Sequence, residues 1–448
     1  MNKKLLAVAV AGVFGAPAVA LAQSSVVISG QIKGGYENLK IGNYGNPGLS
    51  ATGAPSRTLG GSSQHGVVDD SSALVFSVTE DLGGGMQAVV RLDMRIKPDD
   101  GGGVNSSAGL LGGAYNTGNI VSGNSHFGLR SNQWGRIIFG RQDLHYFNTE
   151  SNITDKGSLR ASPVALLSYA GGGATSITTA SRTTNVVHYL SPNWSGFTFI
   201  LAYSSNPAAT ESDISSGLRK GGAWNFNPNF AGANWQVGYS YWDAKPDGPA
   251  ALINGFAAGA CGSTPGVPLT AAACNAATTG ATTGTSIPAV ANQRGDRLYG
   301  SYVFPFGLKI GAAWDKSSLK DVVTGVKTSK RDAWSIPVSY AWGNHTIHVN
   351  YTQANRDTGN CINPVAGCFT TTAAGVGIDT KANMWAVAYS YDLSKRTSLA
   401  LTYAAINNHS GAAYNLFTST SLGLGQSAGA MKIGEDPKTF GLTMRHAF

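Results

Sequence analysis

The sequence predicts an all-β fold, an antiparallel transmembrane barrel of about 16 strands. Segments in which apolar and polar residues alternate recur from residue 26 to the last residue. Short turns between these segments alternate with long loops, as expected when the two rims of a barrel face different compartments. Charged residues make up only 12% of a chain with 59 Gly, 17 Tyr, 16 Phe and 9 Trp. That composition suits neither a helical globule nor a disordered chain.

The N-terminal segment has the features of a secretory leader. Lys3 and Lys4 precede an apolar run, which ends in an A-x-A cleavage pattern at residues 20–22. We expect residues 1–22 to be a signal peptide and residues 23–448 to form one barrel domain. The apolar run is too short for a transmembrane anchor, and no later stretch is apolar over the length of a spanning helix.

The segment 86–97 is the most informative strand. Its apolar face carries residues such as Val90 and Leu92, while Arg91, Asp93, Arg95 and Lys97 occupy the other face. In a soluble sandwich the apolar face would point inward. In a barrel surrounded by lipid the sense is inverted, so the charged face lines water inside.

The remaining strands follow the same period of two. We expect them at residues 26–37, 73–79, 125–130, 136–142, 185–190, 197–203, 218–226, 235–241, 298–304, 308–314, 334–340, 347–351, 385–391, 399–403 and 440–448. The expected tight turns are residues 80–85, 131–135, 191–196, 227–232, 305–307, 342–344 and 392–396. The first loop runs to about residue 70, and the third spans residues 143–183.

The two ends of the expected sheet suit each other. The strand 440–448 has an apolar face and ends at Phe448, and the strand 26–37 shows the same alternation. Pairing these two strands would close the sheet and remove both edges, which is what lipid requires. Trp194, Phe197 and Trp342 gather with Phe448 on the turn side, which predicts an interfacial aromatic girdle.

The charge and the cysteines narrow the function classes. The formal charge is +8, and loss of Lys3 and Lys4 with the leader lowers it to +6. The sequence contains no cluster of basic residues with interleaved aromatics, so a nucleic-acid partner is not expected. The four cysteines form two close pairs in an exported chain, for which we predict one disulfide each. These pairs are Cys261 with Cys274 and Cys361 with Cys368.

Strand alternation selects the charges that should face the lumen. It points these wall residues inward: Lys33, Arg91, Asp93, Arg95 and Lys309. A ring of basic residues at a narrow point favours anions over cations. Simple alternation places Arg141 toward lipid, unless a bulge at Gly140 turns it inward. His188 shares a face with Val186 and Leu190, and we count it with the wall.

The chain resembles the trimeric general porins of the beta-proteobacterial type. The resemblance covers essentially the whole mature chain and is strongest at residues 79–85, 134–142, 187–197 and Phe448. It implies a homotrimer of 16-stranded barrels in the outer membrane, in contact with lipid and lipopolysaccharide. It also implies that the third loop folds into each lumen, and that the barrel-assembly machinery reads Phe448.

The same resemblance supplies the candidate constriction loop. The acids of this loop would be Asp143, Glu150 and Asp155, and Lys156 and Arg160 would pair with them or balance their charge. The resemblance also favours an inward direction for Arg141. The chain departs from the family pattern at three places. Lys33 stands where the family usually has an acid, Ala73 and Ser77 where it often has basic residues, and His188 where it often has an arginine.

The function that follows is passive diffusion of small hydrophilic solutes and ions, with a preference for anions. A substrate-selective channel for anions or organic acids is the alternative, and Tyr146, Phe147 and Tyr169 in the third loop leave room for it. An enzyme is disfavoured, because the neighbouring His409 and Ser410 would point to opposite faces and no G-x-S-x-G motif occurs. We expect no cofactor and no metal, since the histidines lack ligand spacing.

Overall fold

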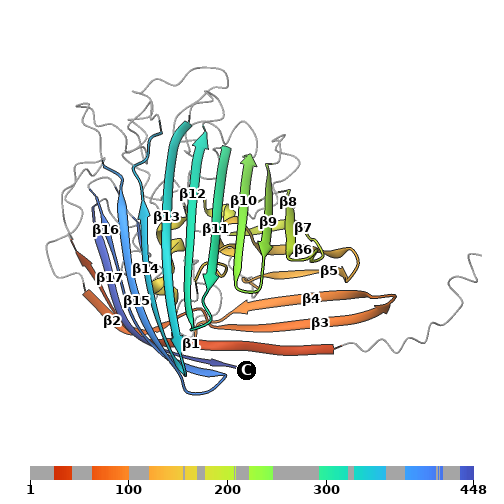
Figure 1. Cartoon of the computed structure of the whole chain (residues 1–448), viewed down its shortest axis with the longest axis horizontal. Helices are drawn as coiled ribbons and strands as arrows, with labels where there is room; N and C mark the ends of the chain where they lie inside the picture. Colours follow the sequence, from red (N-terminus) through yellow and green to blue (C-terminus); the bar gives the residue numbers. More distant parts are fainter. Residues whose placement is uncertain are drawn as a thin grey trace, which may run out of the picture.

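The computed structural model describes residues 25–42, 63–99, 121–154, 157–168, 177–205, 207, 221–245, 292–320, 327–359, 379–409, 412, 414–416 and 434–448. The strands within these ranges form one antiparallel sheet that closes on itself (Figure 1). In the part of the chain that the structure describes, no helix is both long and apolar enough to span a membrane. The expected signal peptide lies outside the described residues.

Seventeen strands make up the barrel. They are β1 (Ser25–Gly42), β2 (Ser63–Asp69), β3 (Ala73–Gly83), β4 (Met86–Arg95), β5 (Ser125–Ser131), β6 (Gly135–Asp143), β7 (Arg182–Leu190), β8 (Phe197–Ser204), β9 (Gly222–Ala231), β10 (Trp235–Lys245), β11 (Asn292–Val303), β12 (Leu308–Lys320), β13 (Lys327–Trp342), β14 (His345–Ala354), β15 (Ala382–Asp392), β16 (Thr397–Asn408) and β17 (Asp436–Ala447). Between β6 and β7 the described residues form four short helices: α2 (His145–Asn148), η1 (Leu159–Ala161), α3 (Val164–Leu167) and η2 (Thr178–Ala180).

The predicted count of sixteen is confirmed once β2 and β3 are read as one interrupted strand. β3 pairs with residues 25–31 of β1, and β2 pairs with residues 34–40. Ser71 interrupts them with a φ of 79°. The prediction of a loop up to residue 70 was therefore wrong, because the barrel continues through β2 after that break.

The predicted turn at residues 227–232 was also wrong. β9 continues to Ala231, and Pro228 lies opposite Phe199 of β8. The pairing with β10 skips residues 227–228, where the proline nitrogen has no hydrogen to donate. Similarly, β3 reaches Gly83, so that turn is shorter than residues 80–85.

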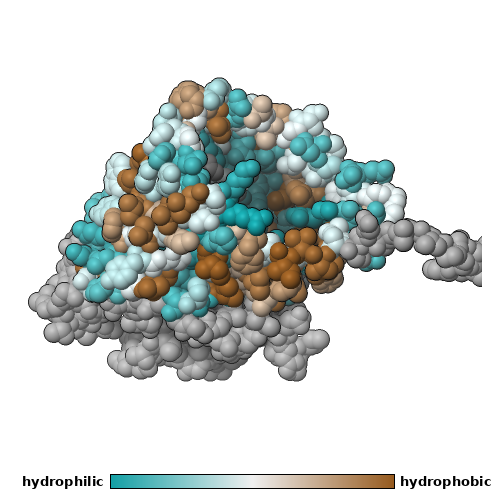
Figure 2. All heavy atoms as spheres, turned by 90° about the horizontal axis from the view of Figure 1, so that it is seen from below, coloured by the Kyte–Doolittle hydropathy of each residue, from teal (hydrophilic) through white to brown (hydrophobic). Residues whose placement is uncertain are grey.

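The barrel has its apolar side chains outside. Along β15, Trp385 and Val387 are exposed while Met384 and Ala386 are buried. The same inversion holds along β17, where Phe440 and its alternate neighbours are exposed. Figure 2 shows the molecule hollowed, with hydrophilic residues around the opening and hydrophobic residues gathered on the outside of the wall. This is the arrangement of a barrel that faces lipid outside and water inside.

The seam joins the two ends of the chain. β1 pairs with β17 from Gln31 and Ala447 through Gly42 and Asp436. Phe448 extends the ladder, because its backbone N–H and C=O both bond to Gly30 at 3.1 Å. The predicted closure is thus confirmed, and the role of Phe448 as an assembly signal stays a prediction.

Gly35 sits where the seam is tightest. A Cβ there would lie 1.8 Å from the carbonyl oxygen of Leu442. We expect Gly35→Val to destabilise the closed barrel by about 1–3 kcal/mol, because the seam must open to admit the side chain. Urea unfolding measures the effect. Gly441→Ala is the matched control, since its Cβ would lie 3.4 Å from the nearest atom. Equal stability of the two variants would contradict the prediction.

The aromatic girdle lies along the turn side of the barrel. Trp194, Phe197, Trp342 and Phe448 are all exposed on the outer face. Trp342 stacks on Tyr340 and on His345 at centroid distances of 5.4 Å and 5.3 Å. Such amphipathic rings sit at headgroup level in membrane barrels, so this rim marks one membrane boundary.

The segment between β6 and β7, called loop 3 from here, folds into the barrel. Its helix α3 contacts β12, β13, β14 and β15, and η1 contacts β15 and β16. Apolar loop residues such as Leu166 and Leu167 pack on small inward residues of that wall: Ala333, Ala354, Ala382, Ala386, Ala388 and Ala404. The inward fold of the third loop is therefore observed, and it narrows the lumen from the β12–β16 side.

Candidate functional site: the lumen and loop 3

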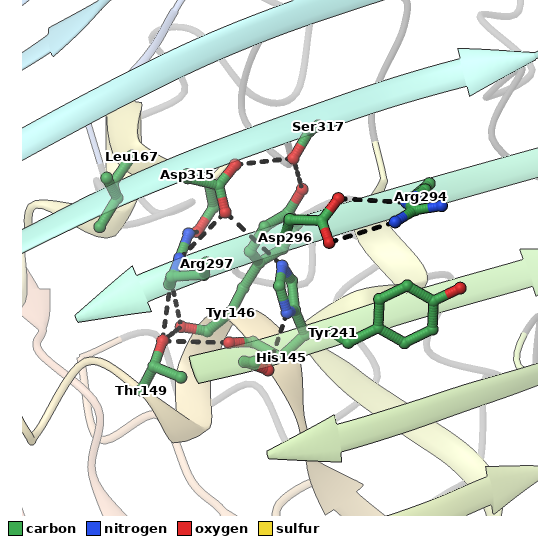
Figure 3. Close-up of polar contacts among 12 residues, drawn as sticks. His145, Tyr146, Thr149, Leu167, Tyr241, Arg294, Asp296, Arg297, Asp315 and Ser317 are labelled. Carbon is green, nitrogen blue, oxygen red and sulfur yellow. Dashed lines mark hydrogen bonds and ion pairs between the residues drawn. The ribbon is translucent and has the colours of Figure 1, made fainter. Parts of the chain in front are cut away.

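A buried carboxylate on β12 holds loop 3 against the wall. Asp315 is fully buried, and Arg297 of β11 approaches it at 3.0 Å (Figure 3). Arg331 of β13 and His145 of α2 lie at 3.9 Å and 3.5 Å from the same carboxylate. Charges removed from water in this way persist only when they are paired and hydrogen-bonded.

The two arginines also bind the loop backbone directly. Arg331 donates to the carbonyl oxygens of Leu166 and Leu167, both at 3.0 Å. Arg297 donates to the Tyr146 carbonyl at 3.1 Å and to the Thr149 hydroxyl at 3.0 Å. Carbonyls at the end of a helix such as α3 lack partners within it, so the wall supplies them.

The loop side chains in this cluster are fully buried. Burial lowers the pKa of the His145 imidazole, although the nearby Asp315 acts in the opposite direction. Burial raises the pKa of the Tyr146 phenol, and the Asp315 carboxylate adds to the rise. His145 Nδ1 lies 2.8 Å from Ser240 Oγ, and Tyr146 Oη lies 2.7 Å from Ser317 Oγ. We call Asp315, Arg297, Arg331, His145 and Tyr146 the loop anchor.

The far part of loop 3 is tied to the seam side of the barrel. Arg160 of η1 pairs with Glu37 and with Asp70, both at 2.9 Å. Lys33 pairs with the same Asp70 at 3.1 Å. Burial alone would lower the pKa of Arg160, but the carboxylates of Asp70 and Glu37 raise it. The predicted wall residue Lys33 and loop residue Arg160 thus meet in one buried ion cluster.

Basic side chains line the opposite wall, on β4 to β7. They face inward because the residues between them, such as Phe127 and Ile137, are exposed outside. We call them the basic strip: Arg91, His126, Arg130, Arg136 and His188. Each lies close enough to the next for their charges to interact. Arg130 donates to Gln87 Oε1 at 2.5 Å, so a neutral acceptor holds its guanidinium.

The predicted wall triplet on β4 lies beside this strip. Asp93 is buried between Arg95 at 2.8 Å and Arg91 at 3.8 Å. The side chains of the two arginines keep 30% and 39% of their surface exposed. Alternation along β4 therefore located three inward charges, of which the carboxylate is covered and the guanidiniums remain open to the lumen.

A cavity of about 670 Å³ lies between loop 3 and the basic strip. Arg136 and His188 line it from the wall, and Asp143 and Glu150 line it from the loop side. Its apolar lining comes from Phe147, Leu190 and Ile200. Two predicted loop acids and one predicted wall residue are therefore brought together here.

Both of these loop acids already have partners. Asp143, at the end of β6, pairs with Arg182 at 2.7 Å and accepts from Asn124 Nδ2 at 2.8 Å. Glu150 accepts a hydrogen bond from the Ser162 hydroxyl. The negative charge on this side of the cavity is thus partly offset, whereas in the basic strip Arg91 alone among the described residues pairs with a carboxylate, that of Asp93.

The remaining predicted residues are placed as follows. Arg141 is half-buried in a bulge between Gly140 and Gln142, where Gly140 has a φ of 142°. The bulge is confirmed, and an inward direction for Arg141 stays a prediction. Lys309 lies at the start of β12, next to a tight turn, between the half-buried Leu308 and the exposed Ile310. Outside the described residues lie Asp155, Lys156 and the cysteine pairs Cys261 with Cys274 and Cys361 with Cys368.

Sequence reasoning missed the residues that do most in this site. Arg130 and Arg136 flank a tight turn, and His126 lies on the same strand face as Arg130. Alternation in the segments 125–130 and 136–142 could have found all three. Strand alternation also places Arg297, Arg331 and Asp315 on the inward face, but no sequence pattern indicates that loop 3 covers them.

No group of three or more His, Cys, Asp or Glu side chains placed to hold a metal ion occurs among the described residues. The site is therefore described by its charges, its cavity and its loop. A lumen of this kind sorts solutes by size and charge.

Known proteins provide an independent comparison. A family model described as Gram-negative porin matches residues 6–411. An outer membrane porin protein of Bordetella pertussis is 33% identical over 137 residues, which are 30% of this chain and 31% of that protein. The matched stretch thus spans less than a third of that relative's length.

Solved structures share the fold. An anion-selective porin from Comamonas acidovorans has a TM-score of 0.64 at 18% identity, covering 95% of this chain and 100% of that one. The trimer form of OmpT, an outer membrane protein of Vibrio cholerae, has a TM-score of 0.55 at 12% identity, covering 95% and 99%. At these identities the likeness shows the barrel and its closure.

Proposed function

Since the chain belongs to the Gram-negative porin family, we propose that it forms a water-filled channel through which small hydrophilic solutes and ions diffuse passively, and that this channel prefers anions. The family places the barrel in the Gram-negative outer membrane. The anion preference is carried by one observation, the basic strip opposite loop 3. Among the described residues Arg130 and Arg136 lie within ion-pair distance of no carboxylate, whereas Arg91 pairs with Asp93. Across the cavity, Asp143 and Glu150 have partners of their own.

The electrostatic effect that would produce the anion preference acts over a short range. The Debye length is about 8 Å at physiological salt, so only charges close to the path of an ion act on it strongly. Arg136 lines the cavity beside loop 3, and its charge interacts with that of Arg91 on β4. The solved Comamonas barrel is described as anion-selective, which supports the same assignment for this chain. A homotrimer is proposed likewise, with the OmpT trimer form as support.

Planar bilayer recording tests the function. We expect stepwise conductance increases in KCl, grouped in threes if the trimer assembles. In a salt gradient the reversal potential should have the sign of chloride permeation. A cation-type reversal potential would defeat the charge assignment and leave the channel intact. An absence of conductance from folded, inserted protein would defeat the channel itself.

A substrate-selective channel for organic acids is the second candidate. The cavity favours it, because it places Arg136 and His188 beside the apolar Phe147, Leu190 and Ile200. A small carboxylate with an apolar body could use both linings at once. The same recordings separate the candidates: a selective channel shows saturable block of the chloride current by benzoate, whereas a general channel passes benzoate without block.

A further inference from the structure

The cavity beside loop 3 presents charged groups of both signs to one space. Its volume is about 670 Å³, which lies in the range of small-molecule binding sites. The basic side chains of Arg136 and His188 line it from the wall, and the carboxylates of Asp143 and Glu150 line it from the loop side. A simple anion is attracted by the first pair and repelled by the second. The charge pattern therefore favours a ligand that carries an anionic and a cationic group together.

The strand register lays out the wall of this cavity in order. Arg136 of β6 lies opposite Leu190 of β7, which in turn lies opposite Ile200 of β8. We call Leu190 and Ile200 the apolar step. His188 lies two residues from Leu190 and therefore on the same face of β7. Neighbouring strands are about 4.8 Å apart, so a ligand that is bound to Arg136 by one end reaches the apolar step with a short side chain.

Two polar atoms of this wall have no hydrogen-bond partner among the described residues. They are Arg136 Nε and His188 Nδ1, and both atoms are buried. His188 as a whole keeps only 3% of its surface exposed. Buried polar groups in proteins are hydrogen-bonded in the great majority of cases. A carboxylate bound in the cavity would accept from Arg136 Nε and from the Nδ1–H tautomer of His188, so it would satisfy both groups.

The loop side of the cavity supplies oxygen acceptors. Asp143 and Glu150 lie there with the neutral side chains of Asn148, Ser151 and Thr154. The Glu150 carboxylate accepts a hydrogen bond from the hydroxyl of the loop serine at position 162 through Oε1. A carboxylate has about four lone-pair sites, so Glu150 can accept from an ammonium group in addition. This side of the cavity therefore suits a cation in the same way as the wall suits an anion.

An aromatic ring on the loop side is held in place opposite the apolar step. The guanidinium carbon of Arg182 lies 5.6 Å from the centroid of the Phe147 ring, and the same guanidinium pairs with Asp143 at 2.7 Å. A side chain that is already fixed loses little entropy when a ligand binds against it. Phe147 and the apolar step thus form a preorganised hydrophobic part of the cavity, next to its charged groups.

We propose that this cavity binds an α-amino acid with an apolar side chain, in its zwitterionic form. The carboxylate of the ligand lies at Arg136 and His188, its ammonium group at Glu150, and its side chain between Phe147 and the apolar step. An α-amino acid joins these three groups through one carbon atom, as the three linings of the cavity require. This inference rests on the proposed function, since the solute enters through the lumen, and it deepens that function by naming a class of solute.

Saturation-transfer NMR on the folded barrel in detergent tests the site, with L-leucine as the probe. 4-Methylpentanoate lacks only the ammonium group of leucine, and 3-methylbutylamine lacks only its carboxylate. We expect each of them to bind about tenfold more weakly than leucine, because each loses one charge-assisted contact. Glycine should also bind about tenfold more weakly, because it leaves the apolar step uncovered.

Two variants assign the charged groups of the ligand. Glu150→Gln can still accept the hydrogen bond from the serine hydroxyl, and it should weaken leucine binding about tenfold while 4-methylpentanoate binds as before. Arg136→Gln should weaken the binding of both of these ligands and leave 3-methylbutylamine unaffected. A variant that misfolds would instead lose all three ligands alike, and heat-dependent gel mobility identifies it.

A matched control removes a lumen charge outside the cavity. Arg445 is half-buried, alternates with the exposed Met444 on β17, and does not line the cavity. Its guanidinium donates to Gln31 Oε1 at 2.7 Å, so it resembles the wall arginines in charge and direction. Arg445→Gln should bind leucine with the native affinity.

Several outcomes would overturn the proposal. They are equal binding of leucine and 4-methylpentanoate to the native barrel, equal binding of glycine and leucine, an equal loss of both acids in Glu150→Gln, and native leucine binding in Arg136→Gln. Because the measurement needs no conductance, it is separate from the bilayer recordings. A chloride-preferring channel that does not bind leucine would defeat this inference alone. A barrel that binds leucine but does not conduct would defeat the proposed channel alone.

Discussion

Replacing Arg91, Arg130 and Arg136 together by glutamine is expected to remove most of the proposed anion preference. Glutamine keeps a hydrogen-bonding side chain of moderate length but carries no charge. Two unit charges about 4 Å apart in water interact by about 1 kcal/mol, so three lost charges should lower the anion-to-cation permeability ratio fivefold or more. The guanidiniums of Arg91 and Arg136 interact with each other and with His126, so the change acts on one continuous strip.

The measurement is the reversal potential in a KCl gradient, read on single channels. Arg294→Gln is the control, since Arg294 lies on the outer face in an ion pair with Asp296. It removes a unit charge from the barrel without touching the lumen, and we expect no shift. If the triple variant and the control gave the native reversal potential alike, the selective charges would lie elsewhere, for example on Arg95 or Lys309.

Asp315→Asn is expected to release loop 3 and to destabilise the barrel. The substitution leaves Arg297 and Arg331 buried without a carboxylate, and breaking a buried pair in this way costs about 3–5 kcal/mol. Both arginines also hold the backbone of loop 3. The loop should therefore move from the β12–β15 wall, and the single-channel conductance should change together with the stability.

Two readouts are needed, urea unfolding and conductance. Asp392→Asn is the control, because Asp392 is exposed at the turn end of β15 and is not part of the loop anchor. If the Asp315 variant had native stability and native conductance, the loop anchor would contribute neither to the stability of the barrel nor to the position of loop 3. Lower stability with native conductance would show that the loop anchor stabilises the barrel wall but does not hold loop 3 in place.

The barrel could be predicted from the sequence because strands that span a membrane alternate apolar and polar residues in a regular way. Alternation along residues 86–97 places Arg91 and Asp93 on the face that the structure finds inside, and the matched ends predicted the seam. The code fails where the backbone departs from regular pairing. Pro228 signals a turn in a soluble context, but here it lies inside β9, since the pairing with β10 skips residues 227–228 and so accommodates its missing N–H.

The site was less predictable than the fold, for a physical reason. Alternation says that Arg297, Asp315 and Arg331 face inward, and inward charges in a wide lumen are normally wet. Whether water or loop 3 covers them depends on contacts between segments more than a hundred residues apart, such as Arg331 with Leu166. No local pattern records those contacts. The resemblance to known porins indicated the inward loop, and the structure adds which side chains secure it.

The pairing of β1 with β17 has a consequence for how the molecule is made. Gln31 and Ala447 are neighbours in space although they are far apart in sequence, so β1 cannot complete its pairing until β17 has been made. Until then both end strands are open templates for other chains. Contacts of such high sequence separation form slowly. The outer edges of β1 and β17 therefore stay open to wrong pairing until the two strands meet.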